Sequence, residues 1–332
     1  SFTLSGANAS GYTALSLSAS GRGSFSNSAD LHPVYTPSIA DITAGSVTLT
    51  LTSIATPPCL NSSSSLTLSI TRQVTAFAGA DGQVCQNAPF TVSGSDAQFY
   101  NAITWSHNGA GILNNISTLT PTYTPAINES GIVTLTLSAS ANSPCADVSD
   151  AMQLAVHPLP VASAGPDESS CQGFNYNING ASGTDYSTVS WTENGTGSLI
   201  NPSNIAPTYV PGVGETGNVT LTLTIMGTNS CAAESSTDTR ILSITPLPEV
   251  DAGIDATICA SNTLTLNAVQ QYCSVVSWTS SGDGIFTDAN STASVYTPGS
   301  TDIANGFAIL TLTGTGTGSC SGLNDVDQLT LT

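Results

Sequence analysis

The sequence contains four copies of one unit, and this internal repetition limits the possible folds more than any other feature. A tyrosine in similar surroundings recurs after 88, 86 and 87 residues. After each tyrosine comes a loop that ends in glycine and then an alternating run such as VTLTLT at residue 47. The recurring aromatic residues are Tyr35, Tyr123, Tyr209 and Tyr296, together with Trp105, Trp191 and Trp278, and Leu17 takes the place of the tryptophan in the first copy.

The alternating runs place Val and Leu on one face and Thr on the other, which predicts half-buried β-strands. A period near 87 residues is too long for one turn of a solenoid and suits a β-sandwich of about seven strands. We therefore predict an all-β chain of tandem immunoglobulin-like domains, with the recurring tryptophans and tyrosines in the cores. The predicted repeats are repeat 1 (1–74, without its first strand), repeat 2 (75–158), repeat 3 (159–246) and repeat 4 (247–332).

Within repeat 2, the pattern predicts strands near 74–78, 90–94, 101–106, 111–114, 120–124, 132–140 and 151–156. The connectors between repeats are short, and two of them contain Leu-Pro with another proline close by. Because proline fixes φ, these joints are expected to be stiff and the chain to form an extended rod.

The charge balance excludes several classes of function. There is no lysine, and three arginines stand against 22 acidic residues, which gives a net charge of -19 and a pI near 4.1. Binding to nucleic acid or to anionic membrane through basic residues is excluded, as is any chemistry that needs a lysine. No apolar run reaches the ~18 residues that could span a bilayer, so direct membrane insertion is not expected.

The cysteines predict disulfides rather than a metal site, because no CxxC pair occurs. Each complete repeat has one cysteine near its start and one after the long alternating strand, separated by 60, 60 and 61 residues. We predict one bond inside each repeat, which implies an oxidising, extracellular location. The predicted pairs are Cys85 with Cys145, Cys171 with Cys231, and Cys259 with Cys320.

Cys59 and Cys273 are left over. The counterpart of Cys59 would fall just before Ser1, so the missing first strand of repeat 1 belongs to sequence upstream, was removed, or is supplied by a neighbouring molecule. Cys273 has no counterpart in the other repeats and is either a buried free thiol or a partner for Cys59 of a neighbour.

Two sets of recurring acidic residues are candidates for calcium binding. Asp81, Asp167 and Asp255 each lie four residues before a cysteine, close to a predicted joint between repeats. A second set, in the loop before the long strand, comprises Asp41, Glu129, Glu215 and Asp302. Calcium takes six to eight oxygen ligands, often from one loop, and no DxDxDG pattern is present. Asp81, Asp167 and Asp255 are the preferred candidates, and the alternative for all of these residues is a role in turns.

No catalytic residues are predicted. The three histidines fall at different points of different repeats, and no GxSxG motif occurs.

The segment WTSSGDGIF at 278, the YTP tripeptides and the AGxDxxxC openings resemble the PKD-like, immunoglobulin-like repeats of very long surface adhesins in Bacteroidota. The resemblance implies a seven-stranded sandwich, secretion, and a role in adhesion, gliding or filament formation. The Gly-Asp-Gly turn is intact only in repeat 4, at Asp283.

The sequence therefore predicts an extracellular structural protein, a stalk or filament-forming surface adhesin that can associate with itself. The alternative is an adhesion module whose exposed loops bind a surface glycan or protein. That alternative needs exposed aromatic side chains, because stacking on a sugar requires an open ring face.

Overall fold

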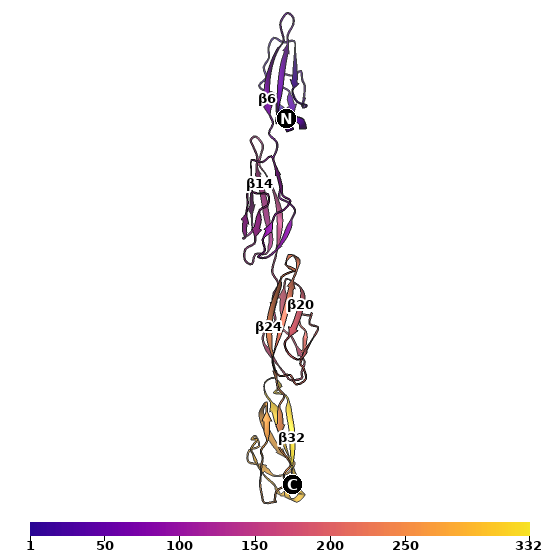
Figure 1. The fold of residues 1–332 in the computed structure, drawn as a ribbon, viewed down its shortest axis with the longest axis vertical. Coiled ribbons are helices and arrows are strands. Elements are labelled where there is room, and N and C mark those ends of the chain that lie inside the picture. Colours follow the sequence, from indigo (N-terminus) through magenta and orange to yellow (C-terminus); the bar gives the residue numbers. More distant parts are fainter. The chain divides into compact units, whose positions relative to one another are not determined.

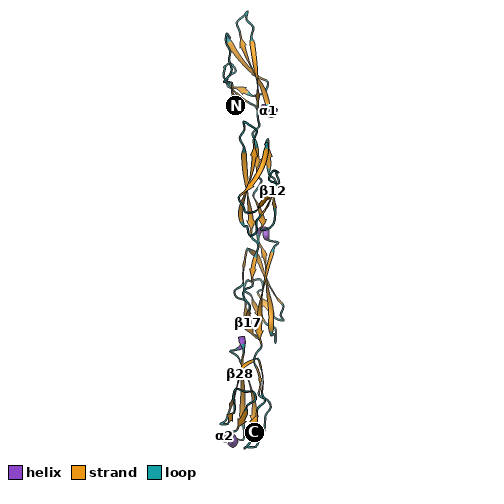
Figure 2. Cartoon of the chain, turned by 90° about the vertical axis from the view of Figure 1, so that its left-hand side faces the viewer, coloured by secondary structure: helices purple, strands orange, loops and turns teal.

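The computed structural model describes residues 1–332, and almost all of its regular structure is β-strand (Figures 1 and 2). The chain divides into two compact units, Ser1–Pro158 and Leu159–Thr332. No helix in either unit is long and apolar enough to cross a membrane.

In the first unit, repeat 1 has two three-stranded sheets, with strand orders β2-β5-β6 and β1-β4-β3. Its elements are β1 (Phe2–Thr3), β2 (Ala14–Ala19), β3 (Ser24–Phe25), β4 (Val34–Thr36), α1 (Ile39–Ala44), β5 (Ser46–Ile54) and β6 (Ser62–Ser69).

Repeat 2 has a four-stranded sheet of order β11-β14-β15-β8, in which β8 runs parallel to β15. A three-stranded sheet, β12-β13-β9, and the pair β10-β7 complete it. Its strands are β7 (Thr75–Phe77), β8 (Gly82–Cys85), β9 (Phe90–Thr91), β10 (Asp96–Gln98), β11 (Ala102–His107), β12 (Ile112–Asn114), β13 (Thr122–Thr124), β14 (Gly131–Ser140) and β15 (Val148–His157).

In the second unit, repeat 3 has the same plan, with sheets β17-β24-β23-β20, β18-β22-β21 and β16-β19. Its elements are β16 (Val161–Ser163), β17 (Glu168–Cys171), β18 (Tyr176–Asn177), β19 (Ser182–Thr184), β20 (Tyr186–Glu193), β21 (Ser198–Ile200), β22 (Thr208–Val210), β23 (Gly217–Gly227), the 3-10 helix η1 (Asn229–Cys231) and β24 (Ser235–Thr245).

Repeat 4 has sheets β28-β31-β32, β26-β30-β29 and β25-β27, and a parallel bridge between Ala256 and Leu331 stands where repeats 2 and 3 have a fourth strand. Its elements are β25 (Glu249–Asp251), β26 (Leu264–Thr265), β27 (Val269–Gln271), β28 (Cys273–Ser280), β29 (Ile285–Phe286), β30 (Val295–Thr297), α2 (Ser300–Asn305), β31 (Ala308–Gly316), η2 (Gly318–Cys320) and β32 (Asn324–Leu331).

Two sheets, with an early strand parallel to the last strand in repeats 2 and 3, form an immunoglobulin-like sandwich, so the predicted fold class is confirmed. Two strands of repeat 2 were not predicted, β8 and β10. The short helices α1 and α2 were also not predicted. Helix α1 is fixed locally by its N-cap, because the backbone N–H of Asp41 donates to Oγ of Ser38 and that of Ser38 donates to Oδ2 of Asp41.

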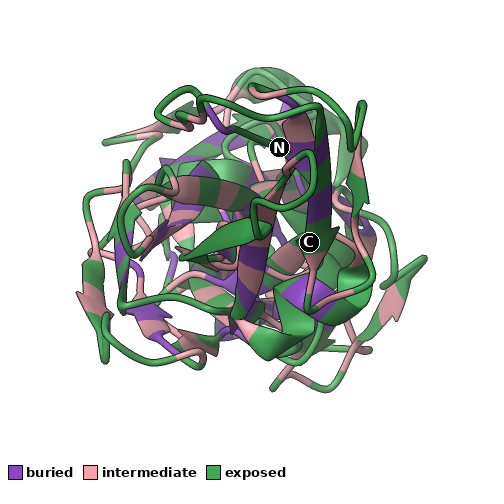
Figure 3. Ribbon diagram, turned by 90° about the horizontal axis from the view of Figure 1, so that it is seen from above, coloured by how far each residue is buried: buried purple, intermediate pink, exposed green.

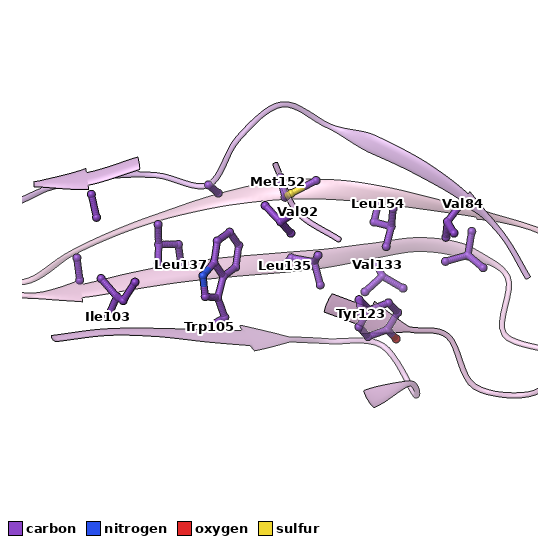
Figure 4. Packing of buried hydrophobic residues seen from close by; sticks show 14 of the residues in the cluster. Val84, Val92, Ile103, Trp105, Tyr123, Val133, Leu135, Leu137, Met152 and Leu154 are labelled. Carbon is purple, nitrogen blue, oxygen red and sulfur yellow. The ribbon is translucent and has the colours of Figure 1, made fainter. Parts of the chain in front are cut away.

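Buried hydrophobic side chains form four separate clusters, two in each unit. Along the long strands, buried positions alternate with less buried ones, as the period of two requires (Figure 3). Figure 4 shows this packing in repeat 2, where Trp105 lies among residues of β14 such as Leu135 and Leu137. The predicted core aromatics are all buried, and the four recurring tyrosines have no exposed surface.

Arg240 lies at a core position that is apolar in the neighbouring repeats. Its side chain is 1% exposed, whereas the same place on the last strand is held by Met152 in repeat 2 and by Leu329 in repeat 4. The guanidinium donates to the backbone oxygen of Asn179 (2.8 Å) and to the hydroxyl of Tyr176 (2.7 Å). It also lies 3.5 Å from Oε1 of Glu168. The burial of this cation is thus compensated by hydrogen bonds.

We predict that the apolar side chains found at this position in repeat 2 can replace the polar network of repeat 3. The double variant Arg240→Met, Tyr176→Phe copies Met152 and Phe90 and should change the stability of repeat 3 by less than about 1 kcal/mol, because well-packed apolar residues replace buried ion pairs without loss. Arg240→Ala should cost about 3 kcal/mol or more, since it leaves a cavity that the methionine side chain fills in the double variant. Hydrogen exchange of the repeat 3 amides measures both effects. Equal losses in the two variants would mean that the polar network itself stabilises this core.

Candidate functional site: the cysteines at the repeat ends

One disulfide joins repeat 3 to repeat 4, between Cys171 and Cys320. Cys171 ends β17 and lies opposite Thr245, the last residue of the parallel strand β24. Cys320 ends η2, in the turn between β31 and β32. Their Cα atoms are 5.0 Å apart, within the range that a disulfide requires, and both residues are buried. The bond therefore connects the end of one hydrophobic core to a loop of the next.

A tight turn after β31 places the sulfur of Cys320 close to the end of β24. A Cβ at Gly316 would stand 2.3 Å from the backbone oxygen of Cys320, so only glycine allows the tight turn after β31. Sγ of Cys320 lies 3.3 Å from the backbone oxygen of Thr245. Beside the disulfide, Oγ of Ser319 donates to Oγ of Ser169 (2.6 Å).

The predicted pairing inside each repeat is wrong. Cys171 bonds to Cys320 rather than to Cys231. Cys145, the predicted partner of Cys85, has a free thiol, and so does Cys259, the predicted partner of Cys320. Cys85 and Cys231 are themselves disulfide-bonded.

The physical reason is the direction of the strands. Cys171 lies beside the end of β24, whereas Cys231 precedes its start, so β24 separates them by about 30 Å at 3.3 Å per residue. Cysteines more than about 7 Å apart cannot be bridged.

Four thiols are free, those of Cys59, Cys145, Cys259 and Cys273. Cys59 and Cys259 are exposed, and the other two are partly buried. Sγ of Cys145 lies 3.6 Å from the backbone oxygens of both Thr71 and Arg72. Sγ of Cys273 lies 3.3 Å from the backbone oxygen of Gln271.

In each repeat, an acidic residue of the second set accepts a hydrogen bond from the buried tyrosine six residues before it. We call this pair of side chains the lock. In repeat 2, the hydroxyl of Tyr123 donates to Oε1 of Glu129 at 2.8 Å. The backbone N–H groups of Ala110 and Ala126 donate to the same carboxylate, both at 2.7 Å. The other three repeats pair their tyrosine with the acid six residues later in the same way: Tyr35 with Asp41, Tyr209 with Glu215, and Tyr296 with Asp302. These carboxylates fasten the turn before the long strand to the core.

The lock shifts the pKa of both partners. Burial, together with the hydrogen bond to Glu129, raises the pKa of Tyr123 to about 12. Burial also acts to raise the pKa of Glu129, but the N–H groups of Ala126 and Ala110 and the Tyr123 hydroxyl outweigh it, so the net pKa lies below its ordinary value. The carboxylate is therefore held in its charged form.

Each of the preferred calcium candidates accepts a backbone N–H group within its own repeat. Oδ1 of Asp81 accepts from the N–H of Gln153 (2.8 Å), that of Asp167 from Ile241 (2.8 Å), and that of Asp255 from Thr330 (2.7 Å). Each aspartate thus fixes the first segment of its repeat to the last strand. No group of three or more His, Cys, Asp or Glu side chains that could hold a metal ion comes together in the structure.

Comparison with known proteins identifies no family: no protein-family model and no curated protein matches the sequence. Among solved structures, the chain is similar to protocadherin gamma B2 extracellular cadherin domains 3–6, with 12% identity, coverage of 96% of this chain and 91% of the other, and a TM-score of 0.38. It is also similar to the titin I-band fragment I67–I69 (14% identity, 79% and 98% coverage, TM-score 0.42). The chain is also similar to Drosophila N-cadherin EC1–4, with 10% identity, coverage of 98% of this chain and 93% of the other, and a TM-score of 0.36. These values are low, and the fold of this chain follows from its own strands and cores.

Proposed function

We propose that this chain is an extracellular structural protein, a stalk or filament-forming surface adhesin built from four tandem immunoglobulin-like repeats (1–74, 75–158, 159–246 and 247–332). The observation that carries the proposal is the Cys171–Cys320 disulfide, which fastens one core to the next rather than closing a loop inside either. Such a bond adds little to the packing of one domain. It carries tension from one repeat to the following one.

An extracellular location is supported by the chemistry of this bond. Disulfides persist in oxidising compartments and are rare where thiols are kept reduced. The acidic residues support a structural role, because the best-placed ones accept backbone N–H groups or tyrosine hydroxyls that hold strands and turns in place. On this proposal the protein is not an enzyme.

Labelling of native cells tests the location. Antibodies against the chain, visualised by gold particles in electron microscopy, should decorate intact cells on structures that extend from the surface. The matched control is a cytoplasmic protein, which should be labelled only after lysis. If the chain is also labelled only after lysis, the proposal is wrong.

A second candidate, a glycan- or protein-binding module, is favoured by exposed aromatic residues at equivalent places in the repeats. Phe99 and Tyr272 have positive φ values of 58° and 53° and are 45% and 51% exposed. Bulky residues rarely adopt this conformation, and such strain concentrates at functional positions. Binding of the full chain to a glycan array, and its loss in Phe99→Ala and Tyr272→Ala, would support this alternative. No binding by the parent chain would count against glycan recognition.

A further inference from the structure

The connector between repeats 1 and 2, residues 71–73, has no proline, whereas the one between repeats 3 and 4 has two. Arg72 follows Leu68 of β6 by four residues, and Pro246 follows Leu242 of β24 by the same number. Leu68 and Leu242 each pair with the first valine of the alternating run, so Pro246 takes the place of Arg72. Proline fixes φ and stiffens the backbone of its connector. At Arg72 the backbone lacks this restraint, and stiffness has to come from side chains.

The side chain of Arg72 binds repeat 1 at the end of its helix. Nη2 donates to the backbone oxygen of Thr43 at 2.7 Å, and Nε donates to that of Ile42 at 3.3 Å. Both oxygens belong to the last turn of α1, where carbonyl groups lack partners within the helix. A cation is favourable at this end, because the free carbonyl groups carry partial negative charge.

The same guanidinium contacts repeat 2 through Phe99. Its Cζ atom lies 4.8 Å from the centre of the Phe99 ring, within the range of a cation–π interaction. The next residue, Gln73, donates from Nε2 to the backbone oxygen of Ala146 at 3.1 Å, which holds the connector against repeat 2. Arg72 therefore contacts both repeats at once, through hydrogen bonds to one and an aromatic contact to the other.

Phe99 reaches the connector from an unusual backbone conformation that recurs in the following repeats. Its φ is 58°, and the residues at the same place, Asp185 and Tyr272, have φ values of 55° and 53°. All three stand six residues before the tryptophan of the core. In repeat 4, Tyr272 lines a groove together with Pro246 and Pro248 of the preceding connector. An aromatic side chain at this place thus lies beside the connector both at Arg72 and at Pro246.

We propose that Arg72 and Phe99 form a latch that holds repeats 1 and 2 at a fixed angle, and that this joint bends reversibly when the latch opens. The hydrogen bonds and the ring contact are lost together on bending, because one side chain makes all of them. The restraint that Pro246 places on the backbone persists in any orientation, so the connector between repeats 3 and 4 stays stiff. The latch goes beyond the proposed function, because it sets the mechanics of the joint in a stalk, a filament or a binding module alike.

Spin labels on repeats 1 and 2 test the latch in the full chain. They are carried by non-natural amino acids at Leu60 and Ser117, two exposed loop positions, so that the cysteines are left untouched. Leu60 lies in the turn between β5 and β6, at the end of repeat 1 away from the connector, so a small bend changes the distance between the labels. Pulsed electron paramagnetic resonance measures the distribution of this distance.

Arg72→Ala should raise the fraction of chains outside the main distance peak about ten-fold, because hydrogen bonds from a charged group and the ring contact are both lost. Arg72→Lys should recover only part of the narrow distribution, because an ammonium group lacks the planar fork that serves two carbonyl groups and a ring together. Arg22→Ala is the matched control. It removes the same charge beside α1, where the backbone N–H of Arg22 donates to Asp41, and should leave the distribution unchanged.

A distribution as narrow in Arg72→Ala as in the parent chain would overturn the latch, and so would equal broadening in Arg22→Ala. Broadening together with faster hydrogen exchange in β5 or β14 would also overturn it, because Arg72 would then stabilise a repeat rather than the joint.

A double variant tests whether the two side chains act together. Phe99→Ala should broaden the distribution, and Arg72→Ala, Phe99→Ala should broaden it no further than Arg72→Ala alone. A larger effect in the double variant would show that Phe99 acts independently and would contradict a shared latch.

Discussion

When the second unit is pulled between position 159 and Thr332, the chain with its Cys171–Cys320 disulfide is expected to lengthen by about 500 Å less than a chain without it. The bond encloses a sequence separation of 149 residues and holds its ends 5.0 Å apart. At up to 3.6 Å per extended residue, this segment would otherwise contribute about 500 Å. Tension passes through the two sulfur atoms instead, and the segment between Cys171 and Cys320 is not extended.

Single-molecule force spectroscopy on the full chain measures this difference, with handles attached through chemistry that does not involve cysteine. The double variant Cys171→Ser, Cys320→Ser should show the full lengthening. A second double variant, Cys59→Ser, Cys273→Ser, removes two free thiols and should behave like the parent. If the parent lengthens as much as the Cys171→Ser, Cys320→Ser variant, the disulfide does not carry the load.

Replacing Glu129 by Ala is expected to destabilise repeat 2 by about 3 kcal/mol. The change leaves the fully buried Tyr123 hydroxyl and the backbone N–H groups of Ala110 and Ala126 without their acceptor. A buried group without a partner costs about 1–3 kcal/mol, and these losses are not additive. Hydrogen exchange of the repeat 2 amides measures the effect separately from the other repeats.

Two further variants serve as controls for Glu129→Ala. Glu129→Gln keeps an acceptor oxygen and should lose less, and Asp96→Ala, at an exposed site, should be close to neutral. A loss in Glu129→Ala no greater than in Asp96→Ala would show that the lock does not stabilise the repeat.

The same lock gives a dependence on pH. The pKa of Glu129 is lowered by folding, so its contribution is complete above the pKa of the unfolded chain, about 4.3, and is lost as the pH falls through the lower folded value. The free energy of unfolding of repeat 2 should therefore decrease below about pH 5. Glu129→Gln should show a weaker decrease, and an equal one in both chains would assign the acid sensitivity to other groups.

The all-β fold could be predicted from the sequence because the sequence has two clear periods, one of two residues and one of about 87 residues. The alternation of Val and Leu with Thr marks the long strands, and the recurrence of Trp105 and Tyr123 near every 87 residues marks the cores. The helix α1 escaped prediction because six residues carry no periodic signal, and its formation depends on hydrogen bonds between Ser38 and Asp41.

The cysteine pairing could not be obtained from spacing. Cys171 and Cys231 are separated by 60 residues whether or not they meet, and the decisive fact is that β17 runs parallel to β24. The lock did leave a sequence signal: each recurring tyrosine is followed by an acid six residues later, as in Tyr123 and Glu129. This constant spacing indicates a contact between the two side chains rather than a metal site.

Peptide mapping without reduction tests the central structural claim most directly. The four free thiols are first blocked by alkylation, and the chain is then digested with pepsin at acidic pH, where disulfides do not exchange. We expect a peptide containing Cys171 to be linked to one containing Cys320, with Cys145 and Cys259 alkylated. Linkage of Cys171 to Cys231 and of Cys259 to Cys320 would contradict the covalent connection between successive repeats.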